Sequence, residues 1–236
     1  MYARIKQCNY GVTLIELLVV FAVISVLAAI IFPVFDSVRQ RSDQSSCLSN
    51  LHQIGLAINA YAADSDDLYP AGLDPVDKYT DLFKTAAGGK YWNTVQSMPQ
   101  IQTVLSPYTR SATVWRCPSD KGFDQVESDG VIPLAAHPSS FDKYGDSYMY
   151  RTELGLTHQT LSGVVGTEPA PSTIQHGPSD INVLSDLSGE WHGSIGDVNH
   201  RYNVLMGDGR VTSMTQAQFD ACWQMQFVPP TGPPSS

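Results

Sequence analysis

An apolar run over residues 12–35, interrupted by one formal charge at Glu16, constrains the fold of this chain more than any other feature. A helix of that length is about 36 Å long, which is enough to cross a hydrocarbon core of about 30 Å. The run exceeds the apolar region of an ordinary secretory signal, and no small-residue cleavage site follows it. We therefore predict a retained membrane-spanning helix near the N-terminus.

The charged residues in and around this run carry the information about its role and orientation. Glu16 is costly in lipid, because a buried carboxylate needs a counter-charge or a proton. Arg4 and Lys6 precede the run and favour a cytoplasmic N-terminus, but Arg39 and Arg41 follow it and balance the count. From the residues alone, an uncleaved single-span anchor with an isolated glutamate is the simplest alternative.

The hexapeptide GVTLIE at residues 11–16 resembles the processing site of type IV pilin precursors. Glu16 is the fifth residue after Gly11, as in type IV pilins and pseudopilins, and Pro33 is the twenty-second, where many pilins have a helix-bending proline. The resemblance implies that a prepilin peptidase cuts between Gly11 and Val12 and that Val12 becomes an N-methylated N-terminus. Residues 1–11 are then a cytoplasmic leader, and the C-terminal head lies outside the membrane.

This resemblance gives Glu16 a physical role. Cleavage creates an α-amine at Val12, four positions from the glutamate. In a staggered bundle of helices, Glu16 of one subunit would meet the amine of its neighbour, and the pair would set the register of assembly. The predicted partners are the prepilin peptidase, other pilin or pseudopilin subunits, the secretion or pilus assembly machinery and the membrane.

The helical pattern continues beyond the membrane run. Cys47, Leu51, Ile54, Ile58 and Tyr61 recur at spacings that place them on one helical face, and Gly55 on this helix favours close approach of a strand. We predict one long bent helix over residues 12–63, with an assembly half at 12–35. The amphipathic half and a globular head occupy 36–228, and 229–236 is a disordered tail. The fold class is α+β, a long helix packed on an antiparallel sheet.

Short strands and loops are expected in the head. Residues 113–117, 147–151 and 181–186 are candidate strands, and 202–214 is a hairpin that turns at Gly207-Asp208-Gly209. Thr215 and Gln218 form a capping-box pattern, which predicts a short helix ending near Trp223. Segments 71–90 and 119–145 are rich in glycine, proline and aspartate and are predicted to be long loops.

Patches of the head resemble a group of prepilin-like proteins named for a His-x9-Asp-Gly motif. These patches are SCLSNLHQIGLA at 46–57, RCPSD at 116–120 and SYMY at 147–150, together with His200 followed by Asp208-Gly209. Seven residues, rather than nine, separate His200 from Asp208. The resemblance informs the architecture more than the activity of the chain.

The four cysteines are Cys8, Cys47, Cys117 and Cys222. Cys8 would leave with the leader, so an odd number remains outside the membrane, where disulfides persist. Cys47 and Cys117 lie in two of the patches that resemble the family, and we favour a disulfide between them; Cys117–Cys222 and Cys47–Cys222 are the alternatives. Because the chain has no C-x-x-C motif, a structural zinc site is not expected.

Two groups of polar residues are candidates for a binding site. His200 and Asp208, with Gly209 and the nearby His192, suggest a metal or catalytic cluster; the alternative is that His200 starts a strand and Asp208-Gly209 forms a turn.

The second group consists of Asp64, Asp66 and Asp67, which oppose the dipole at the C-terminus of the long helix. Calcium would offset this repulsion, because it prefers oxygen ligands. A solvated loop that ends the helix is the alternative.

The whole sequence predicts a structural subunit rather than an enzyme. No nucleophile–base pair, phosphate loop or zincin helix occurs, and the net charge of −9 argues against binding of nucleic acid. The predicted function is that of a pseudopilin or minor pilin, held in the inner membrane by a single helix before assembly into a filament, with its head in the periplasm or outside the cell. The alternative is a membrane-anchored sugar- or metal-binding domain that does not assemble.

Overall fold

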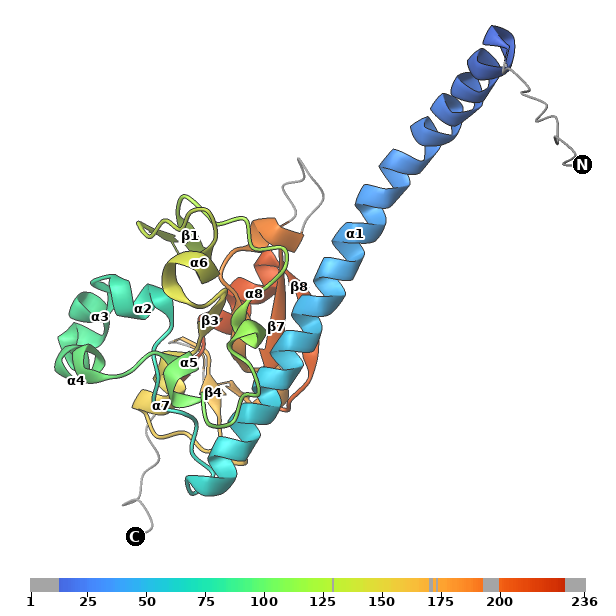
Figure 1. Cartoon of the computed structure of the whole chain (residues 1–236). Coiled ribbons are helices and arrows are strands. Elements are labelled where there is room, and N and C mark those ends of the chain that lie inside the picture. Colours follow the sequence, from blue (N-terminus) through green and yellow to red (C-terminus); the bar gives the residue numbers. More distant parts are fainter. Residues whose placement is uncertain (1–12, 129, 170–171, 173, 193–199, 228–236) are drawn as a thin grey trace, which may run out of the picture. The chain divides into compact units, whose positions relative to one another are not determined.

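The computed structural model describes residues 13–227 apart from 129, 170–171, 173 and 193–199 (Figure 1). The chain divides into two compact units, Met1–Ser42 and Asp43–Ser236, and we call the second unit the head. The predicted cleavage site between Gly11 and Val12 and the predicted tail at 229–236 lie outside the described residues. The predicted α+β class is confirmed, because one long N-terminal helix is followed by antiparallel sheets.

Helix α1 (Leu14–Asp64) agrees closely with the helix predicted over residues 12–63 and continues without interruption through position 33. It ends where Asp66 and Asp67 adopt φ angles of 51° and 63°. This left-handed conformation is one that aspartate tolerates better than most residues. The N–H of Asp67 donates to the carbonyl of Ala62 at 2.9 Å, which satisfies one of the carbonyls left over at the helix end.

The part of α1 in the head buries the face that the sequence pattern predicts. Cys47, Leu51 and Ile54 are all 0% exposed and belong to the main hydrophobic core. A Cβ atom at Gly55 would lie 2.9 Å from Cδ1 of Leu205, so the glycine lets the sheet approach the helix closely, as predicted.

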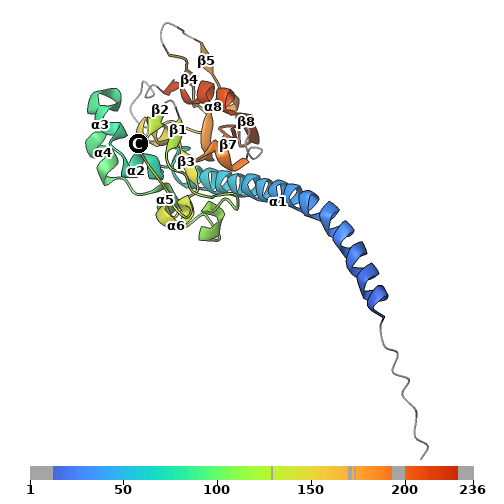
Figure 2. The same cartoon turned by 90° about the horizontal axis from the view of Figure 1, so that it is seen from above.

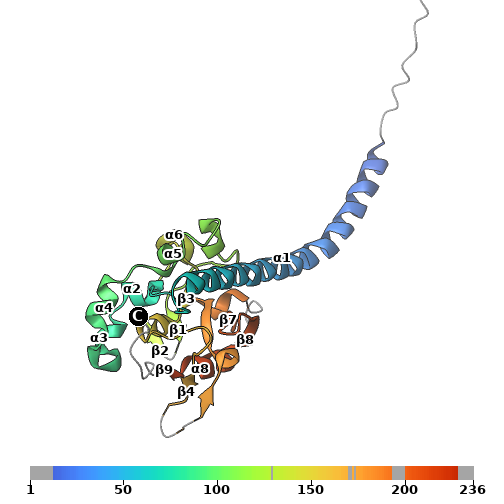
Figure 3. The ribbon, with the colours of Figure 1, turned by 90° about the horizontal axis from the view of Figure 1, so that it is seen from below.

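The main sheet has four antiparallel strands in the order β3-β6-β7-β8. These strands are β3 (Tyr148–Tyr150), β6 (Asn182–Asp186), β7 (Arg201–Met206) and β8 (Val211–Thr215). The head part of α1 runs beside β7 and β8 (Figures 1 and 3), where Gln44 on the helix and Ser213 on β8 are hydrogen-bonded at 3.5 Å. The candidate strands at 147–151 and 181–186 are thus confirmed.

The predicted hairpin and the helix that follows it are also confirmed. Strands β7 and β8 are joined by a turn in which Gly209 has a φ of 83°, a conformation that favours glycine. Helix α8 (Gln216–Trp223) begins directly after β8, and Thr215 and Gln218 cap each other's backbone N–H groups in a full capping box.

The strand predicted at residues 113–117 is wrong. The structure has a short 3₁₀ helix, η2 (Ala112–Trp115), in its place. The side chain of Ser111 accepts a hydrogen bond from the N–H of Thr113 at 3.2 Å and thereby caps this helix. A local side-chain cap therefore prevails over the strand propensity of the segment.

The long loops predicted at 71–90 and 119–145 are also wrong, because both segments contain short elements. Asp74 caps one helix, which has Pro75 at its first position, and Ser139 caps another, which ends at a left-handed Gly145. Figure 2 shows the first group of helices at the edge of the head opposite β7 and β8. The elements are α2 (Pro75–Tyr79), α3 (Leu82–Thr85), η1 (Ala86–Gly89), β1 (Val126–Ser128), β2 (Gly130–Ile132) and α6 (Ser140–Tyr144), with α4 (Trp92–Ser97) just beyond the first segment.

The remaining elements are too short to leave a periodic pattern in the sequence. A three-stranded antiparallel sheet has the order β5-β4-β9, and two of its strands, β4 (Gly166–Thr167) and β9 (Gln226–Phe227), come from distant parts of the chain. The others are β5 (Gln175–His176), α5 (Ile101–Val104), α7 (Thr152–Leu156), η3 (Pro178–Asp180) and η4 (Gly189–His192).

Asp74, the residue that caps α2, is buried with a carboxylate that is costly to ionise. It is 1% exposed, and its Oδ1 accepts the N–H of Asp77 at 2.8 Å. Burial is the main cause that raises the pKa of Asp74 to about 8, and the nearby charges of Asp146 and Glu153 add to it. The pKa of Asp74 in the folded protein lies above the value of about 3.9 in the unfolded chain. The folded head therefore loses stability as the pH rises from about 4 to about 8.

Asp74→Asn is therefore expected to stabilise the head at alkaline pH. Asparagine keeps the capping oxygen but removes the charge. The free energy of unfolding should exceed that of the wild type by on the order of a few kcal/mol near pH 9, and by little near pH 4. Denaturant unfolding of the detergent-solubilised protein at both pH values measures this, with the exposed Asp81→Asn as a control. A wild type and an Asp74→Asn variant with the same pH dependence would contradict the prediction.

Candidate functional site

The N-terminal part of α1 exposes apolar side chains on every side. Leu14 is 82% exposed and Phe32 is 71% exposed, and the large aliphatic and aromatic residues between them are at least half exposed. Among the helices described, α1 is the one that is long and apolar enough to span a membrane. A helix that is apolar all round needs lipid or other apolar helices as its surroundings.

Glu16 and Thr13 form a capping box at the start of this helix. Oε2 of Glu16 accepts hydrogen bonds from the backbone N–H and from Oγ1 of Thr13, both at 2.8 Å, and the N–H of Glu16 lies 3.3 Å from Oγ1 of Thr13. The arrangement holds the carboxylate at the positive end of the helix dipole. Sequence reasoning assigned a role to Glu16 and missed Thr13, although the Thr-x-x-Glu spacing is itself a capping-box signal.

A disulfide between Cys47 and Cys117 ties α1 to the segment that follows η2. This is the pairing that we favoured from the resemblance. Both residues are buried, and Cys222, whose side chain is half-buried, is a free cysteine. A covalent link across 70 residues constrains the unfolded chain and thereby stabilises the folded head by about 2–4 kcal/mol.

A buried polar pair lies directly against this disulfide. Nε2 of His192 is 3.3 Å from Sγ of Cys117 and 3.2 Å from Oδ2 of Asp186. The side chains of His192 and Asp186 are 1% and 0% exposed. Sequence reasoning did not find this group, because its members lie far apart in the chain and share no local spacing.

The structure does not bring His200 and Asp208 together. His200 directly precedes β7, and Asp208 lies in the turn that follows it, so a strand of roughly 20 Å separates them. The carboxylate of Asp208 accepts the N–H of Arg210 at 3.0 Å within the turn that Gly209 shapes. His192 contacts Cys117 and Asp186, so it does not complete a cluster with these residues.

The acidic residues at the end of α1 have separate partners. Oδ2 of Asp64 accepts the hydroxyl of Tyr108 at 3.2 Å, and Oδ2 of Asp67 accepts the N–H and the hydroxyl of Ser162. These contacts fit a loop that ends the helix, and in the part of the chain that is described the carboxylates of Asp64, Asp66 and Asp67 do not form a ligand cluster. Calcium binding stays a prediction, and a melting temperature of the purified protein that ignores both calcium and chelator would exclude it.

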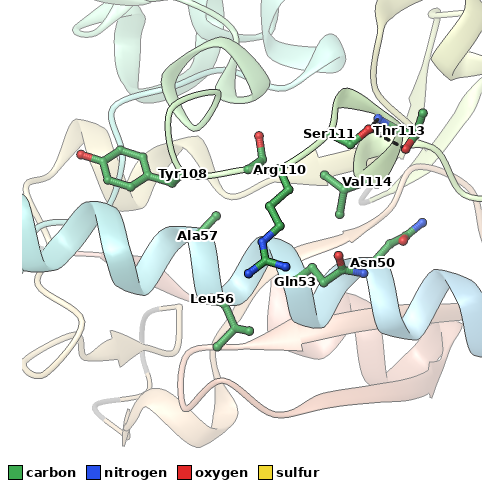
Figure 4. Close-up of a pocket in the computed structure, with 10 residues that line it drawn as sticks. Asn50, Gln53, Leu56, Ala57, Tyr108, Arg110, Ser111, Thr113 and Val114 are labelled. Carbon is green, nitrogen blue, oxygen red and sulfur yellow. Dashed lines mark hydrogen bonds between the residues drawn. The ribbon is translucent and has the colours of Figure 1, made fainter.

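An open cleft of about 580 Å³ lies in the head between α1 and residues 108–114 (Figure 4). Arg110 reaches from the loop toward Gln53 and Leu56 on the exposed face of the helix. Its lining mixes amide, hydroxyl and guanidinium groups with apolar side chains, which suits a small polar ligand or a peptide.

The comparisons with known proteins agree with the N-terminal geometry. Residues 6–32 match the family described as "Prokaryotic N-terminal methylation motif". The chain is 33% identical to the fimbrial protein EcpC of Eikenella corrodens over 91 residues, which cover 39% of this chain and 56% of that protein. It is 39% identical to the type IV major pilin protein PilA of Myxococcus xanthus over 64 residues, which cover 27% of this chain and 29% of that protein.

The chain carries a type IV pilin-like N-terminus. The matched part of the chain spans about half or less of each of these curated relatives. No solved structure matches it. The methylation motif and the apolar helix α1 together indicate that the protein is anchored in a membrane.

Proposed function

We propose that this protein is a structural subunit of a type IV pilin-like filament, a pseudopilin of a type II-like secretion system or a minor pilin. The observation that carries the proposal is the Thr13–Glu16 capping box at the start of a helix that is apolar on all sides, within a methylation motif. A prepilin peptidase would cut between Gly11 and Val12 and methylate the new amine of Val12.

The proposed assembly follows from what α1 exposes. In the membrane, lipid covers its apolar faces; in a filament, the same faces would pack against the helices of other subunits. The bonds from Thr13 hold the carboxylate of Glu16 at the N-terminal end of the helix, near the position of the Val12 amine in sequence. A neighbouring subunit would supply the matching amine, and the ion pair would fix the axial register.

The finer aspects of the proposal concern location and partners. The leader would remain in the cytoplasm, and the head would lie in the periplasm or outside the cell. Assembly would be driven by ATPases of the secretion or pilus machinery, since no nucleotide-binding motif occurs in this sequence.

Processing tests the proposal directly. Co-expression with a prepilin peptidase is expected to remove residues 1–11 and add one methyl group to Val12, as measured by intact-mass and N-terminal analysis. Gly11→Val should abolish the change, whereas Gly177→Ala, a glycine in the head with open space around it, should leave it intact. Recovery of the native protein with residues 1–11 attached would contradict the proposal.

The alternative function, a membrane-anchored domain that binds sugar or metal and does not assemble, is supported by the cleft beside Arg110. It predicts a chain that keeps its leader, remains dispersed in the membrane and loses ligand binding in Arg110→Ala. Processing and filament entry that are unaffected by Arg110→Ala would favour the pilin-like function instead.

A further inference from the structure

Four side chains that bind metals in other settings converge in the interior of the head. They come from four separate elements: Cys47 from α1, Cys117 from the segment after η2, Asp186 from β6 and His192 from η4. The ligand atoms of Cys47, Cys117 and His192 all lie within 4.8 Å of one another. Oδ2 of Asp186 is 3.2 Å from the same Nε2 of His192 that approaches Sγ of Cys117 at 3.3 Å.

These distances are close to the edges of a zinc coordination tetrahedron. With zinc–sulfur bonds of about 2.3 Å and zinc–nitrogen or zinc–oxygen bonds of about 2.0–2.1 Å, ligand atoms lie about 3.3–3.8 Å apart. The His192–Asp186 and His192–Cys117 separations of 3.2 Å and 3.3 Å fall within about 0.3 Å of these values. The two sulfur atoms lie closer together than this, because they are covalently bonded, and reduction of the bond lets them separate.

The hydrogen bonding of Asp186 provides a second, independent observation. Its Oδ1 is buried and has no hydrogen-bond partner among the residues that the structure describes, whereas Oδ2 accepts the N–H of Asn203 at 2.7 Å. A buried carboxylate oxygen without a partner is costly. Nε2 of His192 carries at most one proton, so it cannot donate well to both Asp186 and Cys117. A cation beside Nε2 and Oδ2 would bind the lone pair of His192 and balance the carboxylate of Asp186, and the bond from Asn203 would orient that carboxylate.

We propose that, when Cys47 and Cys117 are reduced, the four side chains form a closed tetrahedral site for Zn²⁺. Two thiols lose one proton each as they bind the metal, and neutral His192 and ionised Asp186 complete the set. The site holds α1 to the main sheet before the disulfide exists. A disulfide-donating oxidant then accepts two electrons from the two thiolates, Zn²⁺ leaves, and the Cys47–Cys117 bond forms.

The test uses the full-length protein in detergent, with Cys8→Ser and Cys222→Ser so that only the two sulfurs of interest remain. A phosphine, with water as the source of oxygen, reduces the disulfide and becomes a phosphine oxide. Under anaerobic conditions Co²⁺ is then added as a spectroscopic probe. The expected result is one Co²⁺ per chain, with a thiolate-to-cobalt charge-transfer band and the intense visible bands of tetrahedral cobalt, both lost when Zn²⁺ is added.

Variants separate a four-ligand site from simple binding by two thiols. His192→Ala and Asp186→Asn should each weaken Co²⁺ binding by at least about tenfold, whereas His52→Ala, on the exposed face of α1, should leave it unchanged. Circular dichroism of the oxidised variants checks that they fold. Absence of the charge-transfer band, or equal affinity in His192→Ala and the parent protein, would overturn the proposal.

A measurement without variants at the site gives a further check. Zn²⁺ should raise the melting temperature of the reduced protein and leave that of the oxidised protein unchanged, because the disulfide occupies both sulfur ligands. A melting temperature of the reduced protein that does not respond to Zn²⁺ would also overturn the proposal.

Discussion

Glu16→Gln subunits are expected to be made and processed normally but to be almost absent from filaments. Glutamine retains the oxygen that accepts hydrogen bonds from Thr13, so the helix start is preserved. It lacks the charge that the amine of a neighbouring subunit needs, and an unpaired ammonium group in an apolar bundle is strongly disfavoured. The measurement is the ratio of subunit in sheared filaments to subunit in membranes, determined by immunoblot.

Thr13→Ala is the matched control, because it makes the reverse change. It removes the hydroxyl of the cap, at a cost of about 0.5–2 kcal/mol to the helix end, and keeps the charge of Glu16. We expect filament entry to fall a few-fold at most. Wild-type assembly of Glu16→Gln would refute the ion pair, and an equal loss in both variants would show that Glu16 acts only as a cap.

Arg151→Met is expected to destabilise the head by about 3–5 kcal/mol, the largest effect that we predict for a single substitution there. Nη1 of Arg151 donates to Oδ1 of Asn182 at 2.7 Å and to the carbonyl of Cys222 at 3.0 Å. Nη2 donates to the carbonyls of Trp223 at 2.7 Å and Met225 at 2.5 Å. The guanidinium therefore neutralises the C-terminus of α8 and joins it to the main sheet.

Burial makes these contacts of Arg151 costly to lose. The residue is 2% exposed, and its guanidinium lies 4.7 Å from the ring centre of Trp223 and 5.0 Å from that of Phe227. Methionine fills much of the space but leaves several buried carbonyls without a donor.

Two further arginine substitutions serve as controls for Arg151→Met, and denaturant unfolding measures the stability of all three variants. Arg151→Lys keeps the charge without the planar fork, so an intermediate loss is expected. Arg210→Met, at a side chain that is 55% exposed, should cost less than about 1 kcal/mol. An Arg151→Met variant that loses less stability than Arg210→Met would show that the guanidinium contacts are not net stabilising.

Local sequence signals predicted those elements that are stabilised by residues close together in the chain. The spacing of Cys47, Leu51 and Ile54 predicted the buried face of α1, and the Thr215 capping box predicted α8. The same kind of signal was present but was not used at Asp74 and Ser139, where caps start helices in segments predicted as loops, or at Thr13, which caps the predicted helix α1. These omissions were failures of interpretation, because the information was local.

Other features are decided by contacts between distant segments. The two-residue strands β4 and β9 pair across about a quarter of the chain, and each is too short to show a period of two. His192 and Asp186 meet the Cys47–Cys117 disulfide because η4, β6, α1 and the segment after η2 pack around one core. The separation of His200 from Asp208 is likewise set by β7, which extends between them.

By itself, the sequence determined that this chain carries a pilin-like apolar helix with one acid, because hydrophobicity and the spacing from Gly11 are properties of a single continuous segment. It also determined which face of that helix is buried. Only the tertiary structure decided which side chains surround the disulfide and that the guanidinium of Arg151 caps the C-terminus of α8. Those contacts depend on the packing of segments that are remote in the chain, and no local free-energy term in the sequence specifies them.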